Sequence, residues 1–440
     1  MAEWLVLGIF MIVFPGLTLG NAAAMIVVTG VAACAPSMRS DTLRSISYVL
    51  VAVSLLLGIG VILNAWYYTD YLGGTAGSPV LINDDSHRWW NDAVYHIDGD
   101  RGERAHAGFG LYGYVLACVL WLFGSTVGTA LIWSMAMTLV ALIMAGWLAF
   151  RLTRNVNVSA LAIGCTAAVC YWLAMGTLIL KEPFVFVAIL TGALGLTYKK
   201  GRMFLAMAVA TLMLSLSRKN FILYLVLGLF IVGVRKRNYV WPLITAGVCL
   251  AVWYAVYVVV QPEAFQRIIS SVPTSAISYD APNQMALYNI IGDYTLLPFY
   301  KKILYMPLSA VVQFFIPFPW NFARDVPFGI TEAYAHFGYP WYLFGFCVGF
   351  FIIGQRHNFR HPVYRMTLWA LVCWLVPCYL FGGTISRYGL PLVAVFAPAV
   401  ALTIAANYRK RKFYGWLSAY CALVGIVLVV AHHLHKAAGG

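Results

Sequence analysis

Carboxylates are concentrated in one short stretch of an otherwise apolar chain. The sequence LINDDSHRWWNDAVYHIDGD fills residues 81–100, and six of the chain's 15 acidic residues lie between positions 84 and 103. A positioned aspartate can take a proton from a hydroxyl group while its oxygen attacks an activated carbon. The stretch therefore predicts a general base. Asp84 and Asp85 are the candidates because they lie closest to the apolar segment 47–65 that precedes them.

Two other roles are open to these aspartates. A short helix is predicted over residues 86–97, and Asp85 could cap it. Asp84, Asp85 and His87 could also bind a divalent metal. Their spacing is generic, so no metal is counted among the expected cofactors.

The aromatic residues of the stretch have two interpretations. Trp89, Trp90 and Tyr95 could stack on sugar rings, but an aromatic belt at the membrane surface is the favoured interpretation because such belts are common. His96 and His106 are interpreted as solvated loop residues.

The composition predicts a membrane protein. The chain is 62% hydrophobic and only 10% charged, with a mean hydropathy of +0.81. Many apolar runs approach the 20 residues that a helix needs to cross a bilayer. Examples are residues 47–65, 126–150, 159–180, 239–260, 390–406 and 416–430. We expect an all-α polytopic membrane protein with a single membrane domain over residues 1–440.

Charge and cysteine usage exclude other classes. The net charge is +14, but the basic residues cluster at the ends of apolar runs, as the positive-inside rule requires. Nucleic acid is therefore not an expected partner. The nine cysteines include no CxxC motif, so neither a disulfide framework nor a zinc site is predicted.

The basic clusters also set the predicted topology. Turns with the following residues are placed in the cytoplasm: Arg39/Arg44, Arg151/Arg154, Lys199/Lys200/Arg202, Arg235–Arg237, Arg356/Arg360 and Arg409–Lys412. About 12 to 13 crossings result. The acidic loop 66–125 and a second loop 261–340 then lie outside. Segment 108–123 lies on or dips into the outer leaflet, because a full crossing there would put Arg151 outside, and segment 303–320 is interfacial or re-entrant.

Basic residues on the outer side run against the rule that places the others inside. They occur at three helix ends, as Lys181 with Glu182, Arg218 with Lys219, and Arg387 with Tyr388. Ionisable groups near the membrane are costly and are usually retained for a purpose. Lys181 could simply pair with Glu182, or the cations could extend to lipid headgroups.

Three basic sites at one level, beneath a loop rich in carboxylates, favour a bound phosphate or pyrophosphate. A lipid phosphate is a good leaving group when cations stabilise its developing charge. An external base and interfacial cations together fit sugar transfer from a polyprenyl-linked donor. Trp320, in the PFPW motif, either lines the lipid's access route or forms a structural turn.

The order of these segments resembles a known family. NDDSHRWWNDAVYH precedes HAGFGLYGYVLACVLWLFG, and LAFRLTR, LILKEPFVFVAIL and SRYGLPLVAVFAPAVAL follow. This order resembles the GT-C superfamily of integral-membrane glycosyltransferases, which use polyprenyl-phosphate-linked sugars, and the related O-antigen-type polymerases. The resemblance implies a GT-C-like helical bundle with extracytoplasmic loops and surface helices.

The resemblance also implies roles for individual residues. It places the catalytic carboxylate at Asp84 or Asp85 and the lipid phosphate near Lys181, Arg218 and Arg387. Many members have an Asp-Glu pair at the acidic position, whereas this chain has Asp-Asp, so which aspartate acts is open. These 440 residues show no counterpart to the large soluble domain of some members, which favours a saccharide or lipid-linked acceptor.

The resulting hypothesis is a glycosyltransferase or repeat-unit polymerase at the outer face of a bacterial inner membrane. Its partners would be a lipid-linked saccharide donor, the acceptor and other polysaccharide-assembly proteins. A flippase or transporter for a lipid-linked sugar is the alternative, although no internal repeat is visible. A non-catalytic assembly subunit is the third hypothesis.

Overall fold

Helices are the only regular secondary structure in the described part of the chain. The computed structural model describes residues 84–98, 111–169, 175–218, 221–233, 240–260, 298–315, 338–381 and 389–437, together with parts of 49–61. The helices are α4 (Asp84–Asp98), α5 (Tyr112–Phe123), α6 (Val127–Thr153), α7 (Val156–Ala168), α9 (Glu182–Gly195), α10 (Lys200–Ser217), α11 (Ile222–Gly228), α12 (Val240–Val260), α15 (Phe299–Phe315), α17 (Gly338–Gly354), α18 (Pro362–Phe381), α19 (Leu390–Asn407) and α20 (Arg411–Ala437).

Several helices match the requirements of a membrane span. Among the described residues, α6, α10, α19 and the Arg411–Val430 part of α20 are long and apolar enough to cross a bilayer. Six shorter apolar helices accompany them, among them α9 and α5. The predicted all-α membrane fold is confirmed. α5 has 12 residues and is about 18 Å long, too short to cross a hydrocarbon core of about 30 Å.

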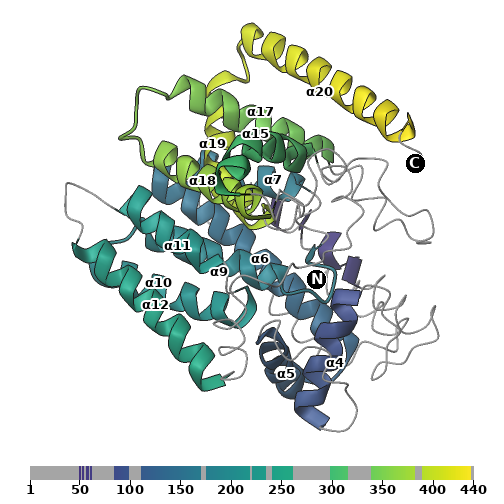
Figure 1. Ribbon diagram of the computed structural model, residues 1–440, viewed down its shortest axis with the longest axis vertical. Coiled ribbons are helices and arrows are strands. Elements are labelled where there is room, and N and C mark those ends of the chain that lie inside the picture. Colours follow the sequence, from purple (N-terminus) through teal and green to yellow (C-terminus); the bar gives the residue numbers. More distant parts are fainter. Residues whose placement is uncertain are drawn as a thin grey trace.

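The core is formed by helices that are apolar on every side. All residues of α9 except Thr191 are buried, and α19 is buried over most of its length. α9 contacts α6, α10 and α19, while α19 also contacts α7, α17 and α18. Figure 1 shows α6 and α9 in the middle of the molecule, α4 and α5 at its lower end, and α20 along the upper edge. A helix that is hydrophobic all round belongs in such an interior.

A small residue allows α6 and α7 to approach closely. The Ser159 hydroxyl donates to the Gly146 carbonyl oxygen at 2.7 Å. A Cβ atom at Gly146 would lie 2.5 Å from the Ile163 side chain. Glycine and serine at an interhelical contact are typical of membrane helices, where close packing replaces the hydrophobic effect.

The predicted crossing over residues 159–180 is wrong in its second half. α7 ends at Ala168, and residues 176–180 form turns and bends, although Leu178, Ile179 and Leu180 are buried. Irregular backbone at such depth is tolerated where the protein itself satisfies its polar groups. Here the Tyr112 hydroxyl donates to the Leu180 carbonyl oxygen at 3.1 Å.

A second irregularity follows α11, which continues as a π-helix over Leu229–Gly233. The Arg365 guanidinium of α18 donates to the carbonyl oxygen of Ile231 at 3.1 and 3.3 Å and also to that of Val232. These carbonyls lie at the helix end, where intrahelical partners are lacking. Arg365 therefore caps this helix from a neighbouring element.

We expect Arg365→Met to lower the free energy of unfolding by about 1–3 kcal/mol, because the capped carbonyls lose a charged donor. Thermal unfolding of the purified protein in detergent measures the change. Arg360→Met is the matched control, since Arg360 is exposed in the turn before α18. Equal melting temperatures for the two variants would contradict the capping role.

Candidate functional site

Two of the predicted cation sites lie together at one end of a helical hairpin. α9 begins at Glu182, directly after Lys181, and α10 runs back to end at Ser217, directly before Arg218. The Nη2 atom of Arg218 forms an ion pair with Oε1 of Glu182. The Glu182 side chain is 2% exposed and that of Arg218 is 14% exposed. An arginine from the neighbouring helix thus pairs with this carboxylate.

The acidic helix packs against the same end of the hairpin. The Nζ atom of Lys181 lies over the Trp89 ring of α4, 4.5 Å from its centroid. The Trp89 ring packs edge-to-face on Tyr112 of α5, with ring centroids 5.4 Å apart. The Tyr112 ring centroid in turn lies 6.0 Å from that of Phe184 in α9. A cation over an indole face is favoured electrostatically, more strongly when desolvated. The first predicted outer loop and the Lys181 site therefore meet, as the sequence hypothesis requires.

The burial of the two tryptophans corrects the predicted aromatic belt. Trp89 is 7% exposed and Trp90 is 4% exposed, and both belong to the main hydrophobic core. A belt residue would present its ring to lipid headgroups. Trp89 instead connects α4 to Lys181, a role that its sequence spacing did not indicate.

The Tyr112 hydroxyl closes this cluster from α5. It is buried, and it bonds the Leu180 carbonyl one residue before Lys181. We expect Tyr112→Phe to lower the free energy of unfolding by about 1–3 kcal/mol, because the buried carbonyl would lose its donor. Thermal unfolding measures this, with Tyr114→Phe as the control on the exposed side of the same helix. Identical losses in both variants would show that the Leu180 bond contributes nothing.

α4 and α5 come into close contact at Gly113. A Cβ atom there would lie 1.8 Å from Oδ2 of Asp92, so a larger residue would displace the Asp92 side chain from its present position. His96 stacks on Tyr114 with ring centroids 3.8 Å apart, and its Nε2 lies 3.7 Å from Oδ1 of Asp92. The interpretation of His96 as a solvated loop residue is wrong. Its i, i+4 spacing from Asp92 was the available signal.

Asp84 and Asp85 occupy the first turn of α4. This helix begins two residues before the predicted segment 86–97, so Asp85 lies within it instead of preceding it. Asp85 is four residues before Trp89, which places their backbones about 6 Å apart along the helix axis. The candidate base is therefore carried by the helix that contacts Lys181. His87, in the same turn, is exposed, and its Nδ1 lies 3.2 Å from Nδ2 of Asn91.

Four predicted site residues lie outside the described residues: Lys219, Arg387, Tyr388 and Trp320. His106 does so as well. In the part of the chain that the structure describes, no three His, Cys, Asp or Glu side chains gather as a metal site would require.

The predicted cytoplasmic basic residues lie at the other end of the hairpin. The Arg151 guanidinium donates to the Thr197 carbonyl oxygen at 3.1 Å and lies 4.9 Å from the Tyr198 ring centroid. Lys199 and Lys200 follow in the same turn. The 14-residue helix α9 spans about 21 Å between this turn and Lys181. The fold thus separates the two groups of cations that the topology prediction distinguishes.

Comparison with known proteins identifies the fold. No family model and no curated protein matches this sequence. The crystal structure of ArnT from Cupriavidus metallidurans bound to undecaprenyl phosphate aligns over 87% of this chain, with a TM-score of 0.50 and 12% sequence identity. The chain is similar to ArnT in fold. At this identity the likeness shows the fold alone, and the helical membrane fold predicted from the sequence is the fold that this chain shares with ArnT.

ArnT is the longer protein, and this chain spans 63% of its length. A second crystal structure of ArnT from the same organism, in the apo state, aligns over 80% of this chain with a TM-score of 0.35 and 16% identity. At these identities the likeness to ArnT concerns the arrangement of the helices.

Proposed function

We propose that this protein is a membrane glycosyltransferase that moves a sugar or oligosaccharide from a polyprenyl-phosphate carrier to a saccharide or lipid-linked acceptor. One observation carries the proposal: Lys181 lies over Trp89 of the helix that bears Asp84 and Asp85, and the adjacent Glu182 pairs with Arg218 from a second helix. The fold adds support, because the similar ArnT structure contains undecaprenyl phosphate.

The arrangement suggests how the carrier phosphate would be held. A guanidinium has five N–H donors, and Nη2 of Arg218 donates to Oε1 of Glu182. Arginine is suited to a carrier phosphate because its planar donor group can bind phosphate oxygens in a bidentate manner. Glu182 is then a positioning residue that fixes the guanidinium. Lys181, which is the N-cap residue of α9, adds a second cation beside the positive end of the helix dipole.

The chemistry would be a displacement at the sugar's anomeric carbon. Asp84 or Asp85 takes the proton of the acceptor hydroxyl while its oxygen forms the new bond to that carbon. The bond between the carbon and the phosphate oxygen breaks, and the phosphate leaves with the electron pair. Lys181 and Arg218 stabilise the charge that develops on it.

The charge distribution suggests which side of the membrane the site faces. We place this site at the outer face of a bacterial inner membrane, because the larger basic clusters occupy the opposite end of the hairpin. The acceptor would be a growing saccharide or a second lipid-linked saccharide, as in a repeat-unit polymerase. Other polysaccharide-assembly proteins would then be its partners.

A transporter of lipid-linked sugars is the second candidate. The non-helical residues 176–180 between α7 and α9 favour it, because interrupted helices form the substrate sites of many transporters. Such a protein would move the lipid without cleaving the bond to its sugar.

One assay separates the two candidates. The full-length protein is placed in liposomes that contain a radiolabelled polyprenyl-phosphate sugar, with a saccharide acceptor on one side. We expect label in the acceptor, and much less with Lys181→Ala. Arg202→Ala, an exposed change at the start of α10, serves as the control. Label that crosses the bilayer on intact lipid supports the transporter. If label neither reaches the acceptor nor crosses the bilayer, both proposals are overturned.

A further inference from the structure

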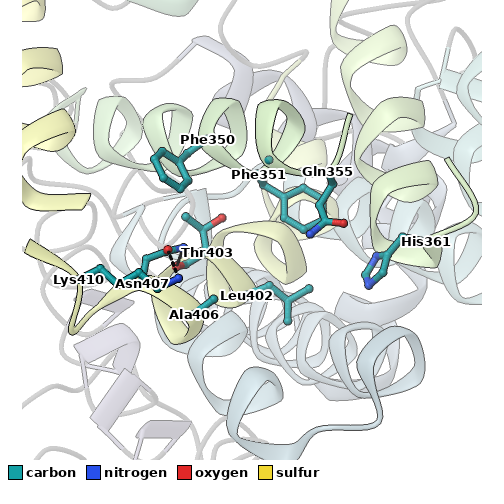
Figure 2. Close-up of a pocket in the computed structure, with 10 residues that line it drawn as sticks. Phe350, Phe351, Gln355, His361, Leu402, Thr403, Ala406, Asn407 and Lys410 are labelled. Carbon is teal, nitrogen blue, oxygen red and sulfur yellow. Dashed lines mark hydrogen bonds between the residues drawn. The ribbon is translucent and has the colours of Figure 1, made fainter. Parts of the chain in front are cut away.

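A cavity of about 340 Å³ lies at the end of the molecule opposite the proposed transfer site. α17 and α19 form it together with the turns that follow them (Figure 2). Leu152, near the end of α6, packs against the small hydrophobic cluster that contains Phe351 of the cavity wall. The neighbouring Arg151 bonds the turn between α9 and α10, about 21 Å along α9 from Lys181. The cavity is therefore separate from the cluster around Lys181.

The lining of the cavity has two chemically different parts. Phe350, Phe351 and Leu402 supply apolar surface, while His361, Asn407 and Lys410 supply polar groups. Phe351 is buried, whereas Lys410 and Ala406 are exposed, so the cavity opens to the surface on the side of the lysine. A ligand that fits must combine an apolar portion with a polar or charged group.

Asn407 holds the ammonium group of Lys410 at the opening of the cavity. The Asn407 side chain donates to the Thr403 carbonyl oxygen at 2.9 Å, and the Lys410 ammonium donates to Oδ1 of Asn407 at 3.1 Å. Figure 2 shows these two bonds as dashed lines beside the cavity. An ammonium has three donors, and this bond uses one of them. Asn407 thus orients Lys410 while leaving it able to bind an anion.

His361 adds a group whose bonding within the protein is incomplete. Its Nδ1 atom is buried, and no hydrogen-bond partner for it occurs among the described residues. Burial lowers the pKa of His361 below its ordinary value, which favours the neutral ring. A neutral imidazole has one donor and one acceptor, so it can complement a hydroxyl or an anionic oxygen.

The surrounding charge selects an anion. No acidic residue follows Glu332 in the sequence. The basic residues around the cavity are Arg356, Arg360, Arg409, Lys410, Arg411 and Lys412. A surface without any carboxylate in its own segment of the chain has a positive potential that attracts anionic ligands. Basic pockets between membrane helices are known to bind anionic lipid headgroups.

We propose that this cavity binds an anionic phospholipid, with its phosphate at Lys410 and the start of an acyl chain along Phe350, Phe351 and Leu402. His361, which lies on the other side of the cavity from Lys410 (Figure 2), would bond a second oxygen of the lipid. The apolar wall favours a lipid over free phosphate, because inorganic phosphate would leave these side chains without a partner. Such a lipid would occupy the groove between α17 and α19 and link the ends of these core helices.

Binding to the full-length protein in detergent micelles tests the proposal. Native mass spectrometry would follow the retention of added dioleoylphosphatidylglycerol, with dioleoylphosphatidylcholine as the lipid without net charge. We expect Lys410→Gln to weaken phosphatidylglycerol binding about tenfold or more, because one charge-assisted contact is lost. Lys412→Gln is the matched control, since Lys412 is exposed and does not line the cavity.

A second variant tests the cavity and not its charge. Ala406→Trp would fill the exposed edge of the cavity and should abolish specific retention while the melting temperature of the lipid-free protein stays unchanged. If Lys410→Gln and Ala406→Trp both retain the lipid as the unmodified protein does, the proposal is overturned. Equal retention of the two lipids, or displacement of phosphatidylglycerol by an equal concentration of inorganic phosphate, would overturn the assignment to an anionic lipid.

Discussion

Replacing Arg218 with methionine is expected to lower the free energy of unfolding by about 3–5 kcal/mol, because Glu182 would become an uncompensated buried charge. The carboxylate is 2% exposed, and α9 surrounds it with apolar residues. The double variant Arg218→Met/Glu182→Gln should recover most of this loss, since replacing both partners of a buried pair is often neutral. Thermal unfolding of the single and double variants measures both effects.

Activity should not recover together with stability. If Arg218 binds the carrier phosphate, the folded double variant still lacks the guanidinium, and we expect sugar transfer to fall about 100-fold or more. Arg202→Met, at the exposed start of the same helix, controls for the loss of one positive charge. A double variant that regained both stability and transfer would show that the ion pair serves folding alone.

The sequence predicted the long apolar helices well. The segment predicted over residues 126–150 is α6, Val127–Thr153, and the one over 390–406 is α19, Leu390–Asn407. Local chemistry marks the beginning of α6, because the Thr126 hydroxyl accepts from the backbone N–H of Thr129 at 3.3 Å. The length of a helix, its hydropathy and its capping residue can all be recognised in the amino-acid sequence.

The break before α9 could not be read in this way. Residues 159–180 form one continuous apolar run, and hydropathy does not distinguish a buried helix from buried irregular backbone. The bond that satisfies the Leu180 carbonyl comes from Tyr112, 68 residues earlier. Such a contact depends on tertiary packing.

For the candidate site, the sequence likewise predicted the location of the cations but not the side chains that they contact. The sequence predicted that Lys181 and Arg218 lie at the same end of the helical bundle, because each stands at the end of one of two adjacent helices. Their partners did not follow. A pair between Lys181 and Glu182 was an alternative interpretation of the sequence, whereas the structure pairs Glu182 with Arg218 and places Lys181 over Trp89. Side chains adjacent in a helix point in different directions, so sequence adjacency is a poor guide to pairing.

The largest effect on catalysis is expected from the aspartates of α4. The double variant Asp84→Asn/Asp85→Asn should lower the rate of sugar transfer by about 10²–10⁴-fold, because asparagine cannot accept the acceptor's proton. The protein should still fold, since asparagine has nearly the same size as aspartate and both residues lie in the first turn of α4. Initial rates with a labelled polyprenyl-phosphate sugar measure the loss.

The single variants then identify the acting carboxylate. If Asp85 is the base, Asp85→Asn should reproduce the loss of the double variant while Asp84→Asn keeps most of the activity, and the reverse identifies Asp84. Asp98→Asn, an exposed change at the other end of α4, should leave the rate unchanged. Full turnover by the double variant would move the base elsewhere, and Asp92, which lies against Gly113 and beside His96, would be the next carboxylate of the helix to test.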